Sequence, residues 1–462
     1  MGEATQMKVD LVVYNAALIA TVDDQRREIP GGWVAVTDGL ISAIGSSTDS
    51  LPDAVQKIDA SGCLVTPGLI NTHHHLYQNL TRAYPPMTSS PLFGWLQTLY
   101  PLWRALDEES AHVSAWIGLA ELALSGCTTS TDHLYLHPRN GGDLLTAEIM
   151  AARDLGIRFH PTRGSMSLSQ KDGGLPPDDV VQEDDEILAF SEEAVARHHD
   201  RSFGAMTRVA LAPCSPFSVT KDLMIRSAEL AEKLDVRLHT HFAENAEDDA
   251  FSIATFGCRP FEYLKEVGWL SDRTWVAHCV MPNDEEIVQL GAAGIGAAHC
   301  PSSNLILASG IAPIVDLRKA GVHVGLGVDG SSSADSASLW LEARQAMLLA
   351  KLRNGADAAD ARMALEVATI GGAGCLGRRG EIGQLAVGLV GDIAIWDLTG
   401  IQFAGAIADP IEGWLRCGPT SARDTIVHGK SIVRNGQLVS SKVDEMMAAH
   451  SRLAFHMQNF KG

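Results

Sequence analysis

Residues 67–75 read PGLINTHHH, an apolar run of strand character that ends in three histidines. His73 and His75 stand two positions apart, so on an extended segment their imidazoles project from the same face. Such a pair can hold one metal ion, because imidazole is a frequent ligand of zinc-class ions. A surface histidine cluster would show the same pattern, so a metal site requires further ligands from elsewhere in the chain.

A repeated alternation of strands and helices follows this run. The alternation is typical of βα units around a parallel sheet, either a barrel or a doubly wound sheet. The periodicity predicts, for example, a helix from Glu108 to Ser125. Eight short apolar strands can be counted, at residues 64–72, 128–132, 157–160, 209–212, 236–239, 275–277, 295–298 and 322–326. Eight such units predict a (β/α)8 barrel over residues 67–373 as the catalytic domain.

The two ends of the chain have a different texture, with short β-rich runs separated by turn residues. We expect residues 1–66 and 374–440 to pair into one small β-sandwich beside the barrel. Residues 441–462 are expected to form a C-terminal helix. Residues 168–186, rich in Gly, Pro and Asp, are expected to form a long loop at the active face.

The composition is that of a globular protein, because 46% of the 462 residues are hydrophobic and 20% are charged. Asp and Glu total 56 against 36 Lys and Arg, and a formal net charge of −20 repels nucleic acid and anionic lipid. Residues 1–6 carry no export signal, and no apolar run reaches the roughly 18 residues of a membrane span. The eight cysteines form no Cys-X-X-Cys pair, which favours reduced thiols. We expect a cytoplasmic homo-oligomer with a small-molecule substrate and with no nucleic-acid or membrane partner.

Active sites of α/β barrels lie at the carboxyl ends of the strands. Here, side chains suited to metal binding or proton transfer follow four of the expected strands: His73 and His75 the first, His241 and Glu244 the fifth, His278 the sixth, and Asp329 the eighth. Three imidazoles and one carboxylate can surround one zinc-class ion and leave a position for water. Glu244 would be placed to move a proton at that water.

These motifs resemble the amidohydrolase superfamily, and within it the branch of deaminases and triazine hydrolases. The resemblance rests on residues 67–75, the spacing of His241 and Glu244, residues 299–304 (HCPSSN) and residues 325–329 (GLGVD). It extends over almost the whole chain. It implies the metal ligands His73, His75, His241 and Asp329, and the catalytic groups Glu244, His278 and Asp329.

The resemblance also implies the number of metal ions and the reaction. Members with two metal ions use a lysine on the fourth strand, and residues 209–217 contain none. One divalent ion is therefore expected, zinc by default, with Fe²⁺ and Mn²⁺ as alternatives. The implied reaction is hydrolytic deamination, in which Asp329 takes a proton from the attacking water and Glu244 protonates the ring nitrogen beside the amine-bearing carbon. His278 would assist at the oxygen of the attacking water.

The substrate is expected to be a free aminopurine-type base. Relatives that act on adenosine-like compounds carry a Glu in the first loop and an Ala-Pro-His run at the fourth strand, whereas residues 82–87 have no acidic side chain and residues 212–217 read APCSPF. Residues 162–168 and 210–219 are most similar to those of bacterial 8-oxoguanine deaminases. This similarity implies conversion of 8-oxoguanine to urate and ammonia, with guanine or isocytosine as alternative substrates. The candidate substrate contacts are Gln78, Arg163 and Cys214.

Other interpretations stay open at this stage. A hydroxytriazine aminohydrolase or chlorohydrolase and a cytosine-type deaminase would use the same ligands, and a non-catalytic assembly protein could keep the same fold. We interpret His133 and His160 as ordinary histidines and Asn304 as a residue that organises its loop. Trp95, at helical spacing from the next apolar residues, is interpreted as core.

Overall fold

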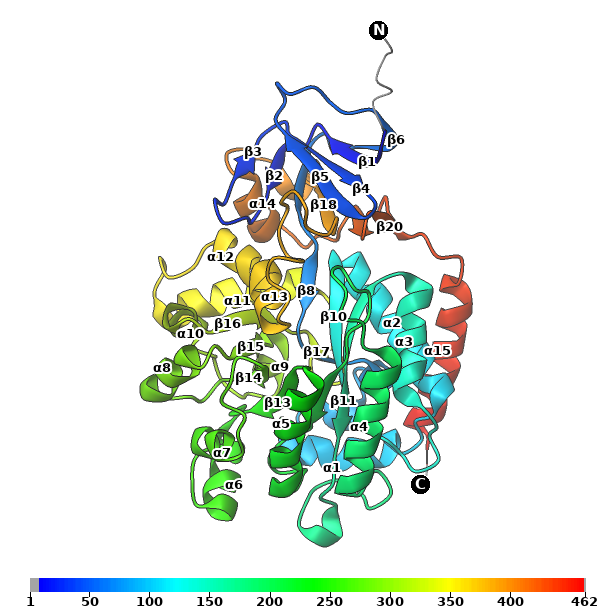
Figure 1. Cartoon of the computed structure of the whole chain (residues 1–462), viewed down its shortest axis with the longest axis vertical. Helices are drawn as coiled ribbons and strands as arrows, with labels where there is room; N and C mark the ends of the chain where they lie inside the picture. Colours follow the sequence, from blue (N-terminus) through cyan, green and yellow to red (C-terminus); the bar gives the residue numbers. More distant parts are fainter. Residues whose placement is uncertain (1–7, 461–462) are drawn as a thin grey trace.

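The computed structural model describes residues 8–460, so residues 1–6, in which no export signal is expected, lie outside the described part. Eight parallel strands close into a barrel in the order β10-β11-β12-β13-β14-β15-β16-β8 (Figure 1). The predicted (β/α)8 fold class is therefore confirmed. The barrel strands are β8 (Leu69–Asn71), β10 (Cys127–Leu134), β11 (Arg158–Ser165), β12 (Ala210–Pro213), β13 (Leu238–Phe242), β14 (Thr274–His278), β15 (Gly296–His299) and β16 (His323–Leu326).

Helices between these strands cover the outside of the barrel. The helix predicted over Glu108 to Ser125 is α2 (Glu108–Leu124), and it begins where Asp107 and Ser110 each accept a hydrogen bond from the other's backbone N–H. The others are α1 (Leu92–Trp103), α3 (Leu144–Leu155), α4 (Asp184–His198), α5 (Lys221–Leu234), α6 (Ala246–Phe256), α7 (Pro260–Glu266), α8 (Asp284–Ala292), α9 (Pro301–Ile306), α10 (Ile314–Ala320), α11 (Leu339–Asn354), α12 (Ala361–Glu366) and α13 (Gly372–Cys375).

Two sheets lie beside the barrel: β5-β4-β1-β6 comes from the N-terminal segment alone, and β21-β20-β19-β18-β7-β2-β3 combines strands of both ends of the chain. Apolar side chains from both ends, among them Val13 and Ile395, share one core. The strands are β1 (Val9–Tyr14), β2 (Leu18–Ala20), β3 (Glu28–Ile29), β4 (Trp33–Thr37), β5 (Leu40–Gly45), β6 (Ala54–Asp59), β7 (Cys63–Pro67), β18 (Ile393–Asp397), β19 (Asp424–Val427), β20 (Lys430–Arg434) and β21 (Gln437–Leu438). Two further helices, α14 (Pro410–Arg416) and α15 (Val443–Gln458), complete the C-terminal segment.

The prediction of one continuous strand over residues 64–72 is wrong. This segment divides into β7, which belongs to a terminal sheet, and β8, which belongs to the barrel. At Gly68, between them, an added Cβ would lie 2.2 Å from the Thr128 hydroxyl oxygen. The Gly68 N–H donates to the Asp392 carbonyl at 3.0 Å. The chain therefore passes from one sheet to the other at a position with no room for a side chain.

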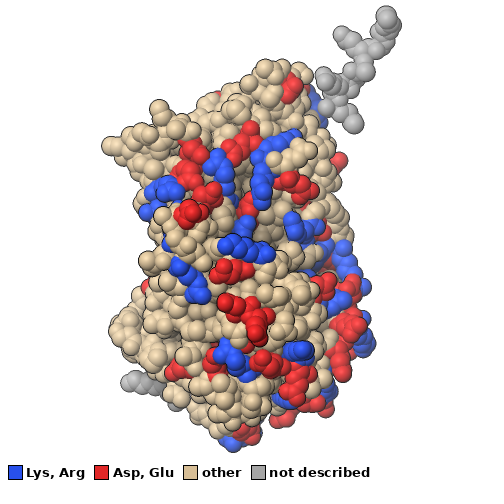
Figure 2. All heavy atoms as spheres, turned by 90° about the vertical axis from the view of Figure 1, so that its left-hand side faces the viewer, with Lys and Arg blue, Asp and Glu red and all other residues tan. Residues whose placement is uncertain are grey.

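The terminal sheets lie at the end of the barrel where β8 enters, at the top of Figure 1, and α1 and α6 lie at the opposite end. The strands thus run away from the sheets, and their carboxyl ends open beside α1. On the face drawn in Figure 2, Lys and Arg side chains are interspersed with Asp and Glu. No helix within residues 8–460 has the length and apolar character needed to cross a membrane.

Candidate active site

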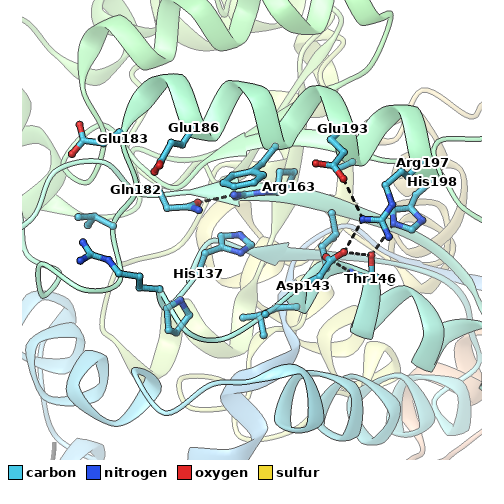
Figure 3. A pocket seen from close by; sticks show the side chains of 18 residues that line it. His137, Asp143, Thr146, Arg163, Gln182, Glu183, Glu186, Glu193, Arg197 and His198 are labelled. Carbon is cyan, nitrogen blue, oxygen red and sulfur yellow. Dashed lines mark hydrogen bonds and ion pairs between the residues drawn. The ribbon is translucent and has the colours of Figure 1, made fainter.

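The structure separates Arg163 from the other predicted site residues. Arg163 lies within β11, and its guanidinium donates to the Gln182 side chain (Nη2 to Oε1, 2.6 Å) and to the Gly164 carbonyl. It borders a cavity of about 660 Å³ between α3 and α4, outside the barrel (Figure 3). This placement corrects the predicted contact of Arg163 with substrate. The strand was expected to end at residue 160 but runs to Ser165, so Arg163 takes an outward-facing position on it.

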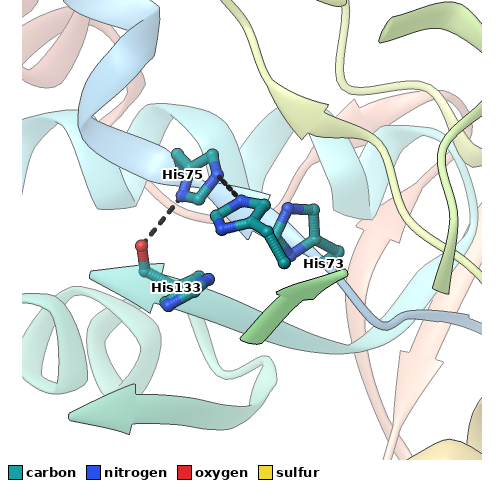
Figure 4. A group of neighbouring side chains, drawn as sticks. His73, His75 and His133 are labelled. Atoms are coloured by element: carbon teal, nitrogen blue, oxygen red, sulfur yellow. Dashed lines mark hydrogen bonds between the residues drawn. The ribbon is translucent and has the colours of Figure 1, made fainter. Parts of the chain in front are cut away.

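Four side-chain atoms converge at the carboxyl ends of the strands. His73 and His75, which Figure 4 shows as neighbours, each place Nε2 3.3 Å from Asp329 Oδ1. His75 Nε2 also lies 3.2 Å from His241 Nε2. A tetrahedral ion with bonds of about 2.0–2.1 Å separates its ligand atoms by about 3.3 Å. His73 Nε2 is buried and has no hydrogen-bond partner among the described residues. The donor set and its spacing therefore fit one divalent metal ion.

The backbone brings these groups together at some conformational cost. His74–His75 (β9) pairs in parallel with Asp329–Gly330 (β17), which places the two ligand-bearing segments side by side. Asp329 has a φ of 59° and His278 a φ of 70°, in the left-handed region that side chains other than glycine rarely adopt. Strain of this kind is concentrated at functional sites, where the surrounding structure holds it in place.

A second histidine, His239, orients His73. His73 Nδ1 lies 2.8 Å from His239 Nε2, and His239 Nδ1 lies 2.9 Å from the Trp275 carbonyl. Because the carbonyl can only accept, His239 carries its proton on Nδ1 and accepts the proton of His73 on Nε2. The lone pair of His73 Nε2 is thereby left free for a metal. Sequence reasoning missed His239, although it stands two positions before His241, in the spacing that singled out His73 and His75.

Backbone carbonyls fix the other two imidazoles. His75 Nδ1 lies 2.8 Å from the His133 carbonyl, and His241 Nδ1 lies 2.6 Å from the Cys214 carbonyl. Each ring therefore presents its Nε2 lone pair to the common point. The His133 ring stacks on that of His241 with 4.8 Å between centroids, so the interpretation of His133 as an ordinary histidine is corrected.

The charge states suit metal binding. Burial lowers the pKa of His73, His75 and His241, that of His241 to about 3, and metal binding requires neutral imidazole. Burial alone would raise the pKa of Asp329, but the interactions of its carboxylate with His73 and the other adjacent imidazoles outweigh that effect and hold the pKa well below its usual value. Asp329 is therefore an ionised carboxylate.

Glu244 and His278 lie beside the four converging atoms. His278 Nε2 is 3.6 Å from Glu244 Oε2 and 3.9 Å from Asp329 Oδ2. His278 Nδ1 lies 3.0 Å from Asn304 Oδ1, so Asn304 turns Nε2 toward the two carboxyl groups. Burial, together with the charge of Asp329, raises the pKa of Glu244 to about 8. A carboxyl group that is protonated at neutral pH can act as a general acid.

A narrow cavity of about 30 Å³ opens onto these groups, which is room for little more than a water molecule. Gln78 and Cys214 line it, and burial raises the pKa of the Cys214 thiol to about 12, so Cys214 is present as a neutral thiol. Trp95 lines it as well and donates from Nε1 to the Ser332 carbonyl at 3.3 Å. Trp95 is a buried member of the main hydrophobic core, as predicted, and in addition forms part of the cavity wall. The remaining walls are mainly apolar or aromatic and include Leu92, Leu96, Tyr100, Tyr135, Phe217 and Leu307.

Comparison with known proteins agrees with this geometry. Residues 64–432 match the model of the amidohydrolase family. The chain is 47% identical to an 8-oxoguanine deaminase of Pseudomonas aeruginosa, over 92% of this chain and 94% of that protein. It is 36% identical to a hydroxydechloroatrazine ethylaminohydrolase of Pseudomonas sp., over 94% and 92% of the two chains. A crystal structure of atrazine chlorohydrolase from Arthrobacter aurescens complexed with zinc has a TM-score of 0.92 and 33% identity, over 96% of this chain and all of the other (100%). The chain belongs to the amidohydrolase family.

Proposed function

We propose that this protein is a metal-dependent deaminase that converts 8-oxoguanine to urate and ammonia. The observation that carries the proposal is the convergence of His73, His75, His241 and Asp329 next to the buried carboxyl group of Glu244. The 47% identity to an 8-oxoguanine deaminase supports the choice of base. Guanine and isocytosine are expected as alternative substrates.

The four converging residues would hold one divalent metal ion, and zinc is the ion we propose, ahead of Fe²⁺ and Mn²⁺. Residues 209–217, around β12, contain no lysine that could bridge a second ion. When bound, the metal supplies a water whose pKa is lowered toward about 7.

The side chains of the chain would move the protons. Asp329 takes a proton from the attacking water, and His278, whose Nε2 lies 3.9 Å from Asp329 Oδ2, assists at the oxygen of that water. Glu244 gives its proton to the ring nitrogen beside the amine-bearing carbon, so that no charge builds up on the ring as the C–O bond forms. The C–N bond then breaks as Asp329 passes the proton taken from water to the leaving amine. The proton of the newly formed C–O–H group returns to Glu244, so ammonia and a carbonyl are produced and both carboxyl groups regain their starting states.

The cavity lining supports a flat, uncharged ring as substrate. Gln78 offers both a donor and an acceptor, and its Oε1 is buried without a partner among the described residues. Apolar side chains of α1 form one wall, and the present space of about 30 Å³ is too small for a purine. We infer that α1 shifts when the base enters. Arg163, which lies in the other cavity, has no part in the proposed site.

Ammonia release from a panel of free bases and triazines tests the proposal. We expect release from 8-oxoguanine at the highest kcat/KM, with weaker release from guanine and isocytosine. A hydroxytriazine aminohydrolase is the second candidate, because the zinc-bound atrazine chlorohydrolase superposes so closely. Turnover of hydroxytriazines without any aminopurine turnover would replace the first proposal by the second. The homo-oligomeric state and the cytoplasmic location stay predictions.

A further inference from the structure

The amino end of the barrel, opposite the candidate active site, holds a cluster of cationic side chains. Arg158 and His160 stand two positions apart on β11 and therefore share the inward face of the strand. Arg208 lies just before β12, and Arg378 lies in the segment that leads from α13 to the terminal sheets. We call Arg158, His160, Arg208 and Arg378 the basal cluster.

Hydrogen bonds tie these side chains to one another through shared acceptors. The Arg158 Nε and the Arg378 Nη2 both donate to the Ala205 carbonyl, at 3.3 and 2.9 Å. The Arg378 Nε and the Arg208 Nη2 donate to the two oxygens of Glu381, at 2.5 and 2.7 Å. The three guanidinium groups are therefore neighbours in one small volume.

The acids within reach do not balance these charges. Arg158 pairs with Asp392, whereas Arg208 and Arg378 share the single carboxylate of Glu381. Among the described residues, the three guanidinium groups thus form ion pairs with two carboxylates. The exposed fractions of Arg158 and Arg378 are only 0% and 1%, so solvent screens this excess positive charge poorly. A buried charge without a partner is strongly unfavourable, and a bound counter-ion would remove that cost.

The side chains of the basal cluster also carry unpartnered donors. Among the described residues, Arg158 Nη2, Arg378 Nη1 and both ring nitrogens of His160 are buried without a hydrogen-bond partner. Burial and the nearby arginines lower the pKa of His160, so its ring is neutral and can donate one N–H. Water could satisfy these donors, but it could not neutralise the excess charge.

We propose that the basal cluster binds a small monovalent anion of the halide class, with chloride as the physiological ligand. The ion must be small and must shed its water, because His160, Arg158 and Arg378 are at most 1% exposed. It would hold the barrel floor against the segment that carries Arg378 and Glu381. Its effect is therefore on stability, and the deamination chemistry at the other end of the barrel does not depend on it.

Thermal unfolding of the full chain tests the site, in chloride and in gluconate at equal ionic strength, because gluconate is too large to enter. We expect Tm to be about 2–4 °C higher in chloride, with saturation as chloride rises. Arg378→Met should lose this difference, and Arg434→Met, which removes an exposed arginine from β20, should keep it. Equal Tm values of the unaltered protein in both salts, or a chloride effect that persists in Arg378→Met, would overturn the proposal.

Crystals of the unaltered protein grown in bromide give a test that does not depend on folding of a variant. We expect an anomalous bromide peak within hydrogen-bond distance of Arg378 Nη1 and His160. Water at this position, without anomalous signal, would overturn the proposal even if Arg378→Met fails to fold.

Discussion

The two ends of the barrel both bury histidines whose pKa values are lowered by burial, yet they gather opposite kinds of atoms. At the carboxyl end, imidazole lone pairs and the Asp329 carboxylate oxygen point at one spot. At the amino end, guanidinium N–H groups and His160 gather around two carboxylates. The first arrangement suits a cation and the second an anion. Both ends contain buried histidines, so the orientation of the donors and acceptors around those histidines decides what each end can bind.

Removal of a proposed metal ligand should have the largest effect on activity, because it disrupts the site at the carboxyl end of the barrel. His241→Ala takes away one of the four converging atoms, so bound metal should fall below about a tenth and ammonia release should fall at least about 1,000-fold. Metal analysis and an ammonia assay on the same preparation check this. His456→Ala, an exposed position on α15, serves as the control and should change neither. Full metal content in His241→Ala would contradict the ligand assignment.

Glu244→Gln should separate chemistry from metal binding. The metal should remain, while kcat falls about 100- to 10,000-fold because the proton donor is lost. The pKa of Glu244 is raised to about 8, so its acid form is present below that pH and is lost above it. The kcat/KM of the unaltered enzyme should therefore fall as pH rises through about 8.

The pH profile of Glu244→Gln should lack this falling limb, which identifies the group. Glu247→Gln, in the first turn of α6, is the matched control: it should keep the rate and the limb, with the limb moved slightly to lower pH because the Glu247 charge helps to raise the pKa of Glu244. An unchanged alkaline limb in Glu244→Gln would assign the titration to another group.

Gly330→Ala tests whether Gln78 contacts the substrate in the cavity. An added Cβ would lie 1.7 Å from Gln78 Oε1, so Gln78 must rotate away from its present position. We expect KM for 8-oxoguanine to rise about 10-fold, with a smaller change in kcat. Gly94→Ala on α1, where the nearest atom to an added Cβ is 4.0 Å away, is the control. A KM equal to that of the unaltered enzyme would exclude Gln78 as a substrate contact.

Arg163→Gln should have the smallest effect. Because its guanidinium is bound to Gln182 and Gly164 outside the site, we expect kcat/KM to stay within about 3-fold. Steady-state kinetics check this. A decrease in kcat/KM of more than 100-fold in a normally folded variant would show that Arg163 acts in the proposed site after all.

The positions predicted best from the sequence are those at or just beyond the carboxyl end of a barrel strand, such as His241 within β13 and Asp329 after β16. Polar side chains after an apolar strand of a parallel barrel meet at one edge, so the place of His241 or Asp329 follows from the strand pattern alone. Arg163 shows the limit of this reasoning. Its role depended on where β11 ends, and the true end lies five residues beyond the expected residue 160. Boundaries of strands depend on tertiary pairing, which periodicity does not contain.

Other features of the structure could not be predicted from the sequence because they also depend on contacts between distant parts of the chain. The division of residues 64–72 at Gly68 depends on the contact with Thr128, which is far away in the sequence. Trp95 has the spacing of a core residue, and helical periodicity identifies a buried face without saying whether protein or a cavity lies against it. His239 could have been found from its spacing to His241, but only three-dimensional structure shows that it accepts a proton from His73.

The most direct test of the central claim is metal content and 8-oxoguanine turnover measured on one sample of the purified chain. The ligand set predicts one divalent ion per chain, with release of one ammonia for each urate formed, and both should be lost together on chelation and restored together by zinc. Two metal ions per chain, or turnover that survives removal of the metal, would contradict a site built from His73, His75, His241 and Asp329.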